Sequence, residues 1–473
     1  MNGIILGLAL CAASLAALGA SLSRADITSG AQPLSGLPVD PGVRGGAAGA
    51  GGFLTGLSAD ELTFANAAAV QFAFPWSVSG TISGEPLAGL GPRYNANGCS
   101  VCHSYPSMGG SSPVTNPQVA MAALDGATNK VPSGTYAKDE LAFIRSDGPV
   151  RVPYRTSTGN LLRLYTIIGR SDAPSGCTSV VIQQPNFSSL LAANDISPRI
   201  PIPIYGIGLV EDTPNSNLVS AQNTSLMTSL GITPGRFNID GNGTIGRLGW
   251  KAATPSTEYF TAFALAVEIG ATTNIFPRKS DETTACQANP LPEDLPLLTR
   301  RTPNTSSISA DYASQQVLES AFARYLAPPV PVTSYTGIHG PVTTASISNG
   351  QAKFISVGCV ACHVQSHTTG NSTMTGQSKL TYTSWSDYAL HNMGTGLADG
   401  LRQGSAGPQD YKTTALWGIG QRIFFLHDGR TTDLYQAILS HSSSQSEANS
   451  VLSNFQGLST SDQQDILNFL RAQ

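Results

Sequence analysis

One short pattern of reactive residues occurs twice in this chain. The string Cys-x-x-Cys-His spans residues 99–103 and returns at residues 359–363. On a helical turn, cysteines at positions i and i+3 share one face, so both thiols can form thioethers with one haem while the histidine reaches its iron. The sequence therefore predicts two covalently bound c-type haems. The attachment residues would be Cys99, Cys102, Cys359 and Cys362, and the proximal iron ligands would be His103 and His363.

A zinc site is the main alternative for these cysteines. Zinc needs about four ligands that lie close together, and Cys-x-x-Cys alone does not separate zinc from haem or a redox dithiol. His367 could complete a zinc set with the second string, but the first string has no comparable histidine nearby. The histidine that directly follows each cysteine pair therefore favours haem.

The ligand on the far side of each iron decides its chemistry. A filled sixth position supports electron transfer, and an open one permits reaction with peroxide or oxygen. Leu434, Ile438 and His441 are spaced i, i+4 and i+7, which places His441 on the apolar face of an expected helix. We predict His441 as the distal ligand of the second haem, with Met393 as its competitor. The first haem has no equally good candidate, because Met227 fits a packing role better.

Length and composition limit the classes of protein. A chain of 473 residues exceeds what one hydrophobic core usually serves, so two domains are expected. Only 12% of the residues are charged and the net charge is -4. Neither value favours a nucleic-acid partner or an anionic membrane surface.

The N-terminus predicts export. Residues 1–25 form an apolar run that ends in Ser-Arg-Ala, a small-x-small pattern typical of signal-peptide cleavage. We expect a secretory signal peptide and a periplasmic protein; an uncleaved anchor helix is the alternative, because the run lacks a preceding Lys or Arg. No other segment reaches the 18 or so apolar residues of a membrane span. Residues 26–55, rich in Gly, Pro and Ala, predict a flexible leader.

Two cysteines stand apart from the repeated strings. Cys177 and Cys286 are isolated in the sequence, and an exported protein can form a disulfide between them. The alternative is two unrelated thiols in one inserted region. The sequence alone cannot supply the distance that would decide between the two.

A weak duplication predicts two related units. The pattern aromatic-Gly-Ile-Gly follows each haem string, at residues 205–208 and 417–420. Capping signals predict helices near both ends of the mature chain, whereas residues 110–330 are rich in turn formers. We expect a mainly α fold with two cytochrome c-like haem domains. The first, residues 56–330, would carry a large loop-rich insertion containing short strands, and the second would span residues 331–473.

The order of the motifs, from about residue 56 to the C-terminus, resembles the di-haem oxidoreductase family. That family is similar to the bacterial di-haem cytochrome c peroxidases and to the di-haem enzyme of methylamine utilisation. The motifs that carry the resemblance are NGCSVCH, RIPIPIYGIGLVED, GRLGWKA, VGCVACH, DYALHNMGTGLADG and LWGIGQRIFFLHDGRTTDLYQAILSH.

The resemblance implies a division of labour. In the relatives, the C-terminal haem accepts electrons with both axial positions filled, which here implies ligation by His363 and His441. The N-terminal haem reacts with hydrogen peroxide, and a nearby Glu moves the proton; Glu211 is the candidate here. Trp250 is a candidate electron relay, with a plain core position as the alternative. Some relatives hold calcium, but residues 240–243 offer only a fragment of a calcium loop.

The expected function is therefore that of an exported oxidoreductase. It would reduce hydrogen peroxide at the N-terminal haem with electrons from a small redox protein or cytochrome. The alternatives are a non-enzymatic electron-transfer cytochrome and a di-haem oxidase that acts on an organic or protein substrate. A shared fold does not choose among these.

Overall fold

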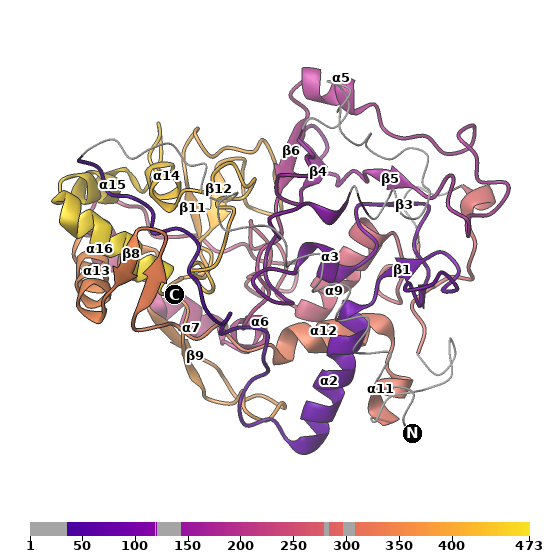
Figure 1. Ribbon diagram of the computed structural model, residues 1–473, viewed down its shortest axis with the longest axis horizontal. Helices are drawn as coiled ribbons and strands as arrows, with labels where there is room; N and C mark the ends of the chain where they lie inside the picture. Colours follow the sequence, from indigo (N-terminus) through magenta and orange to yellow (C-terminus); the bar gives the residue numbers. More distant parts are fainter. Residues whose placement is uncertain (1–35, 119, 121–142, 279–282, 297–307) are drawn as a thin grey trace.

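The computed structural model describes residues 36–118, 120, 143–278, 283–296 and 308–473 (Figure 1). The predicted signal peptide and the first part of the predicted leader lie outside the described residues. Within them, no helix combines the length and the apolar character needed to cross a membrane.

The helices are mostly short. Their bounds are α2 (Ala59–Ala73), α3 (Cys99–Cys102), α5 (Phe187–Ala192), α6 (Ile207–Glu211), α7 (Asn215–Ala221), α8 (Thr224–Ser229), α9 (Thr257–Ala264), the π-helix η2 (Leu265–Ile269), the 3₁₀ helix η3 (Thr284–Cys286), α11 (Ile308–Tyr312), α12 (Gln315–Tyr325), α13 (Thr344–Ser356), the 3₁₀ helix η4 (Cys359–Ala361), α14 (Leu434–Leu439), α15 (Asn449–Gln456) and α16 (Thr460–Arg471).

The strands form small local pairs. β1 (Trp76–Ser77) pairs with β2 (Leu87–Ala88) in parallel, and the other pairs in the described residues are antiparallel. These are β3 (Arg93–Tyr94) with β5 (Tyr165–Thr166), β4 (Val152–Arg155) with β6 (Ile196–Arg199), β7 (Tyr335–Gly337) with β8 (Gly340–Val342), β9 (Ser366–Thr368) with β10 (Thr381–Thr383), and β11 (Leu390–Asn392) with β12 (Asp410–Lys412).

The prediction of a mainly α fold is wrong. The structure is only 30% helical, with 14% strand and the rest in loops. The physical reason lies in the composition: 49 glycines and 30 prolines interrupt the chain, and both residue types disfavour helix interiors. The mainly α prediction extended the helical character of the two capped helices near the ends of the mature chain to the segments between them, which are largely loops.

Two helix pairs organise the two halves of the chain (Figure 1). In the first half, α2 packs against α12, and in the second half α13 packs against α16. The predicted capping box is confirmed at the start of α2, where Ser58 and Glu61 cap each other's backbone N–H groups. The predicted C-terminal helix is confirmed as well, since Ser459 caps α16. Each pair thus joins a helix that precedes a Cys-x-x-Cys-His string to one that follows it.

The two aromatic-Gly-Ile-Gly segments meet each other. The first glycine of each segment has a positive φ, 66° at Gly206 and 69° at Gly418, a conformation that favours glycine. The ring of Trp417 lies against Gly206, and the ring of Tyr205 lies against Gly418. The contact is therefore reciprocal, and it supports the interpretation of the two segments as copies of one structural unit.

The second glycine of each segment lets the chain approach a helix. A Cβ on Gly208 would lie 2.2 Å from a carbonyl oxygen of α12, and a Cβ on Gly420 would lie 2.2 Å from a carbonyl oxygen of α16. Real Cβ atoms do not come this close to a carbonyl oxygen. Alanine at either position would push the segment off its helix, so the duplicated pattern has the same packing role in both halves.

Residues 36–55, predicted as part of a flexible leader, run as an extended strap over both halves. Asp40 forms a buried ion pair with Arg471 of α16, at 2.8 and 2.6 Å, and accepts the N–H of Leu434. Further along, the strap forms backbone hydrogen bonds with the second aromatic-Gly-Ile-Gly segment, with the last residue of α12 and with the residues that follow α12. These backbone bonds join Arg44 to Gly420, Gly49 to Val330, Gly52 to Ala327 and Leu54 to Tyr325.

Replacing Asp40 by Asn should destabilise the fold at neutral pH by about 3 kcal/mol, because it leaves the buried guanidinium of Arg471 without its counter-charge. Burial raises the pKa of Asp40, but the charge and hydrogen bonds of Arg471 outweigh burial and hold the pKa below its usual value. A lowered folded pKa gives stability that is fully present above the unfolded pKa, about 3.9, and lost as pH falls through the folded pKa.

Urea unfolding of the wild type and of Asp40→Asn at pH 7 and pH 3 checks this prediction. We expect the difference between the two proteins in free energy of unfolding to shrink at the lower pH. An equal difference at both pH values would show that the carboxylate charge of Asp40 is not what stabilises the strap.

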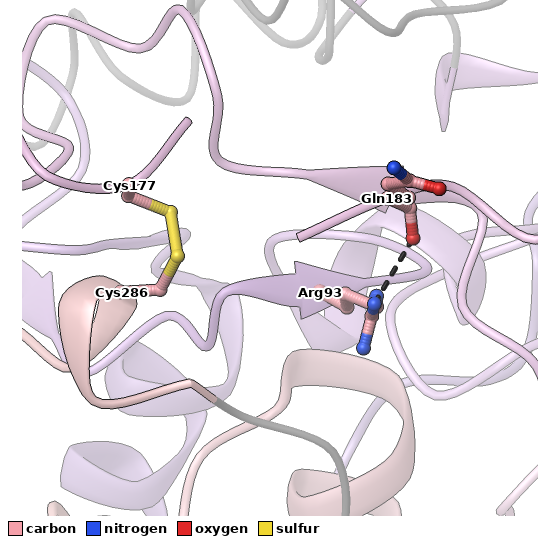
Figure 2. The surroundings of a disulfide bond; sticks show 4 residues. All are labelled: Arg93, Cys177, Gln183 and Cys286. Carbon is pink, nitrogen blue, oxygen red and sulfur yellow. Dashed lines mark hydrogen bonds between the residues drawn. A yellow bond between two sulfur atoms is a disulfide. The ribbon is translucent and has the colours of Figure 1, made fainter. Parts of the chain in front are cut away.

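The predicted disulfide is confirmed. Cys177 and Cys286 are bonded, with an S–S distance of 2.09 Å (Figure 2). Both are buried in the hydrophobic cluster that also contains Trp76 and Phe187. Nearby, Arg93 donates to the carbonyl oxygen of Gln183 at 3.0 Å. The bond therefore ties together two parts of the inserted region that are 109 residues apart in the sequence.

Candidate haem sites

The first Cys-x-x-Cys-His string forms one helical turn, α3, as predicted. Nδ1 of His103 lies 3.0 Å from the carbonyl oxygen of Gly110. A carbonyl oxygen can only accept, so Nδ1 carries the proton and Nε2 keeps its lone pair. Burial lowers the pKa of His103, which keeps the imidazole neutral. No hydrogen bond in the described residues uses Nε2, so this nitrogen is prepared to bind a metal ion such as haem iron.

Buried polar groups surround the first string. Glu319 of α12 faces Cys99, and burial raises the pKa of its carboxyl to about 8. Neither carboxyl oxygen of Glu319 makes a hydrogen bond of normal geometry in the described residues, and neither does the indole N–H of Trp76. The indole N–H is nevertheless close enough to lower the pKa of Glu319 in part, against the larger effect of burial. A second carboxyl, that of Glu268, lies close enough to Cys102 for its charge to raise the pKa of that thiol. Burial raises the pKa of Glu268 itself to about 7. The sequence reasoning missed both carboxyls.

The second string repeats the geometry of the first. Cys359 opens the 3₁₀ turn η4, and Nδ1 of His363 donates to the carbonyl oxygen of Trp385 at 2.8 Å. Burial lowers the pKa of His363 to about 4, so this imidazole is neutral and its Nε2 keeps a lone pair. In the described residues Nε2 of His363 makes no hydrogen bond, as is also the case for Nε2 of His103.

A cavity of about 220 Å³ adjoins the second string. Its wall is mainly apolar and comes from α13, α14, α15, α16 and the β11–β12 pair. The residues that bring chemistry to this wall are Cys359, Cys362, His363, His391, Met393, Tyr411, Lys412, Arg422, His427, His441 and Glu447, and Trp250 reaches it from the first half. An apolar cavity with a few polar groups is typical of a site for a small molecule or cofactor.

His441 shares this cavity with His363. It lies just beyond the end of α14, and its Nδ1 donates to the carbonyl oxygen of Ala437 at 2.9 Å, which continues the helical pattern. Burial lowers the pKa of His441, and the two rings are close enough for a charge on His441 to lower the pKa of His363. The structure thus brings together the two imidazoles that the sequence analysis pairs, each with an unused Nε2.

The other histidines near the cavity are already engaged. His391 contacts Asp387 through Nε2 at 2.9 Å and Glu447 through Nδ1 at 3.0 Å. His367 uses both ring nitrogens as well, the closer contact being 2.6 Å to the Ser386 carbonyl. His427 lies 3.3 Å from the Tyr411 hydroxyl. Met393 lines the cavity and remains a competitor of His441.

The structure gives no support to a bare metal site. The described residues contain no group of three or more His, Cys, Asp or Glu side chains that could hold an ion. Asp240, the first residue of the calcium-loop fragment, accepts the N–H groups of Asn242 and Thr244 and so closes an ordinary turn.

Glu211 lies at the end of α6 and forms an ion pair with α12. Its carboxylate accepts from Arg324 at 2.8 and 3.0 Å and from the N–H of Thr257 at 3.0 Å. Burial raises the pKa of Glu211, but the Arg324 contacts outweigh burial and lower it overall. No hydrogen bond or ion pair in the described residues joins Glu211 to the first string.

Trp250 lines the cavity of the second string and packs on a buried cluster that a residue close to the first string also contacts. Its indole N–H donates to the carbonyl oxygen of Ile200 at 3.0 Å, and its ring meets His427 at 6.4 Å between centroids. The ring lines the cavity of the second string and packs against the same buried cluster as Tyr105, which follows His103 by two residues.

Two cations on the cavity wall fit an acidic cofactor. Arg422 donates through Nε to the carbonyl oxygen of Phe424, and its guanidinium lies 5.8 Å from the centre of the Trp250 ring, but its buried Nη2 makes no hydrogen bond in the described residues. Lys412 makes one hydrogen bond, to the carbonyl oxygen of Arg247. A haem carries two carboxylates, so the cysteines, the unused imidazole nitrogens and these cations together fit such a group. The sequence analysis missed both cations.

Comparisons with known proteins are consistent with these sites. Residues 159–473 match the family described as "Di-haem oxidoreductase, putative peroxidase". The match covers more than half of the chain and includes the second string, His441 and both aromatic-Gly-Ile-Gly segments, but it begins after the first string. A search of curated proteins finds no match.

Proposed function

Because the chain belongs to the di-haem oxidoreductase family, we propose that it reduces hydrogen peroxide at the first Cys-x-x-Cys-His site with electrons received at the second. The overall reaction consumes one hydrogen peroxide, two electrons and two protons and yields two water molecules. A small redox protein or cytochrome would supply the electrons, and the protein would act in the periplasm after export.

The residues of the two strings would hold and orient the haems. Cys99, Cys102, Cys359 and Cys362 would attach them through thioethers. When bound, the haems supply the redox chemistry that no protein side chain offers. His103 and His363 are held by backbone carbonyls with Nε2 as the available ligand atom. A fixed tautomer of this kind orients the ligand and strengthens it as a base.

An asymmetry between the sites carries the proposal. All seven histidines lie in described residues, and the second site contains two imidazoles with an unused Nε2, His363 and His441. The first site has one, His103. Of the rest, His391 and His427 also line the second cavity, His367 is hydrogen-bonded through both nitrogens, and His339 is exposed. Two strong ligands suit electron transfer, and one leaves room for peroxide.

Trp250 and Glu211 would serve the transfer of electrons and protons. Trp250 is the aromatic residue that touches the second cavity and the buried cluster beside the first site. Glu211 is ionised by its pairing with Arg324, so it can accept a proton from peroxide. The same pairing lowers the pKa of Glu211 and so makes its carboxylate a weaker base than a free one. The role of Glu211 in proton transfer is therefore tested by mutation.

Replacing Glu211 by Gln should slow peroxide reduction by about 100-fold with both haems retained, because an amide cannot carry a proton. Steady-state turnover with a reduced electron donor, together with haem content, measures this. Glu258→Gln is the matched control: Glu258 faces the same Arg324 at 3.9 Å but is more exposed. Full turnover in Glu211→Gln would limit Glu211 to the ion pair, and no peroxide reduction by the wild type would refute the proposed function.

A further inference from the structure

Two carboxyl groups that the proposed mechanism does not use lie beside the first string. Cys99 packs against a hydrophobic cluster that contains residues of α2 and α12, and Glu319 belongs to α12. The N–H of Asn95, four residues before Cys99, donates to the backbone carbonyl oxygen of Glu268 in η2 at 2.7 Å. Each carboxyl is close enough to one cysteine of the string for its charge to act on that thiol.

Glu319 is buried without a counter-charge. The residue is 2% exposed, and neither of its carboxyl oxygens makes a hydrogen bond in the described residues. The titratable groups that act on it are Asp294 and Cys99, and a negative charge on Asp294 opposes a second one on Glu319. A buried carboxylate without a cation beside it is costly. Burial therefore raises the pKa of Glu319 to about 8, and the group holds a proton at neutral pH.

The charged groups on the helices that pack against α12 are engaged elsewhere. Glu211 of α6 and Glu258 of α9 both face Arg324, at 2.8 and 3.9 Å. Glu61 caps the start of α2, and Asp60 on the same helix is exposed. These groups therefore do not supply Glu319 with a counter-charge.

Glu268 titrates in the same range. Burial raises its pKa to about 7, although a hydrogen bond with Asn95 and the charge of Arg163 act in the opposite direction. The other titratable groups on which its charge acts are Cys102 and Tyr154. Its element, η2, is a π-helix, which is a rare conformation that often occurs at functional sites.

The carboxylates near the second string are held differently. Asp387 and Glu447 both contact His391, at 2.9 and 3.0 Å. Burial lowers the pKa of His391, but its bonds to the two carboxylates outweigh burial and raise the pKa well above its usual value. Both carboxylates are therefore in ion pairs, whereas Glu319 beside the first string is not.

We propose that Glu268 and Glu319 take up a proton from solvent when an electron reaches the first site. One electron enters and one proton binds to one of the two carboxylates, so the net charge of the site does not change. The cause is electrostatic, because the positive charge of an oxidised haem iron stabilises a nearby carboxylate and reduction removes that charge. The inference rests on the first haem of the proposed function, but not on its reaction with peroxide.

The reduction potential of the first haem should therefore fall as the pH rises. A higher pH removes the proton that favours the reduced state, and the slope should approach about 59 mV per pH unit, the value for one proton per electron. Potentiometric titration of protein that contains both haems, from about pH 6 to about pH 9, covers the pKa values of both carboxyls. The second haem is recognised by the shift of its potential in His441→Gly.

Glu268→Gln and Glu319→Gln test the assignment to these residues. Glutamine has the shape of a neutral carboxyl group but binds no proton, so both variants should fold. Each should reduce the slope, and the double variant should remove most of it. Glu258→Gln is the control, because Glu258 packs beside the same helix but is 44% exposed and lies 3.9 Å from Arg324. Its slope should equal that of the wild type.

Infrared difference spectra of the reduced and oxidised protein give an independent measurement. Protonation of a carboxylate should produce a carboxylic-acid C=O band that shifts in D₂O and is lost in the matching Gln variant. This measurement on the wild type tests the proposal even where a Gln variant does not fold.

Three results would overturn the proposal: a wild-type potential that does not change with pH, a slope that the double variant retains, or the absence of the carboxylic-acid band. Neither measurement uses peroxide. Peroxide reduction with a pH-independent potential would therefore refute this inference alone. A pH-dependent potential without peroxide turnover would refute only the proposed function.

Discussion

Replacing His441 by Gly should convert the iron of the second haem from low spin to high spin and raise its reduction potential. The imidazole of His441 is held by the Ala437 carbonyl with Nε2 unused, beside the imidazole of His363. Without it, a weak ligand such as water would take the sixth position, and two strong nitrogen ligands would no longer favour the oxidised iron. Absorption spectra and potentiometric titration measure the two effects, and the spin conversion should be essentially complete.

Two further samples make this result specific. Added imidazole should enter the space left in His441→Gly and restore the low-spin spectrum. His367→Gln is the control, because His367 is hydrogen-bonded through both nitrogens and does not line the cavity. A low-spin spectrum in His441→Gly without added imidazole would assign the ligand to another residue, of which Met393 is the first to examine.

Replacing Cys99 and Cys102 by Ala should remove one haem per chain and reduce peroxide turnover by about a thousandfold or more. These thiols attach the first haem in our account, and the cofactor carries the chemistry that side chains lack. Haem content per chain and steady-state peroxide reduction measure the two effects. The first string lies outside the residues that match the family, so this variant tests the part of the account that rests on sequence motif and geometry alone.

The equivalent pair at the second string provides the comparison. Cys359 and Cys362 replaced by Ala should also leave one haem per chain, but the remaining haem should still respond to peroxide and lack only its electron supply. Two haems in the Cys99/Cys102 variant would show that the first string does not attach one. A peroxide response that survives there and disappears in the Cys359/Cys362 variant would reverse the roles of the two sites.

The features that could be predicted from the sequence are those that depend on residues close together in the chain. The spacing of Leu434, Ile438 and His441 follows helical periodicity, and the structure puts all three on one cavity. Glycine permits unusual dihedrals and close approach of the backbone, and the glycines of the duplicated segments do both. Capping signals and the pairing of the two isolated cysteines are also short-range or compositional arguments, and the structure agrees with them.

The features that sequence reasoning missed depend on distant contacts. Arg422 and Lys412 look like ordinary surface cations in the sequence, yet both line a pocket to which residues from the two halves of the chain contribute. Glu319 belongs to an amphipathic helix, and its contact with Cys99 follows from the packing of α12 beside the first string. The fold class failed for a related reason: the helices at the ends were recognised, but no local signal revealed how much of the chain between them packs as loops.

Low-temperature electron paramagnetic resonance, on the oxidised and half-reduced protein with and without hydrogen peroxide, tests the central claim most directly. The account predicts one low-spin haem iron, from the His363 and His441 site, and one high-spin haem iron at the His103 site whose signal changes when peroxide is added. Two low-spin irons that ignore peroxide in both redox states would contradict it and identify the protein as an electron-transfer cytochrome.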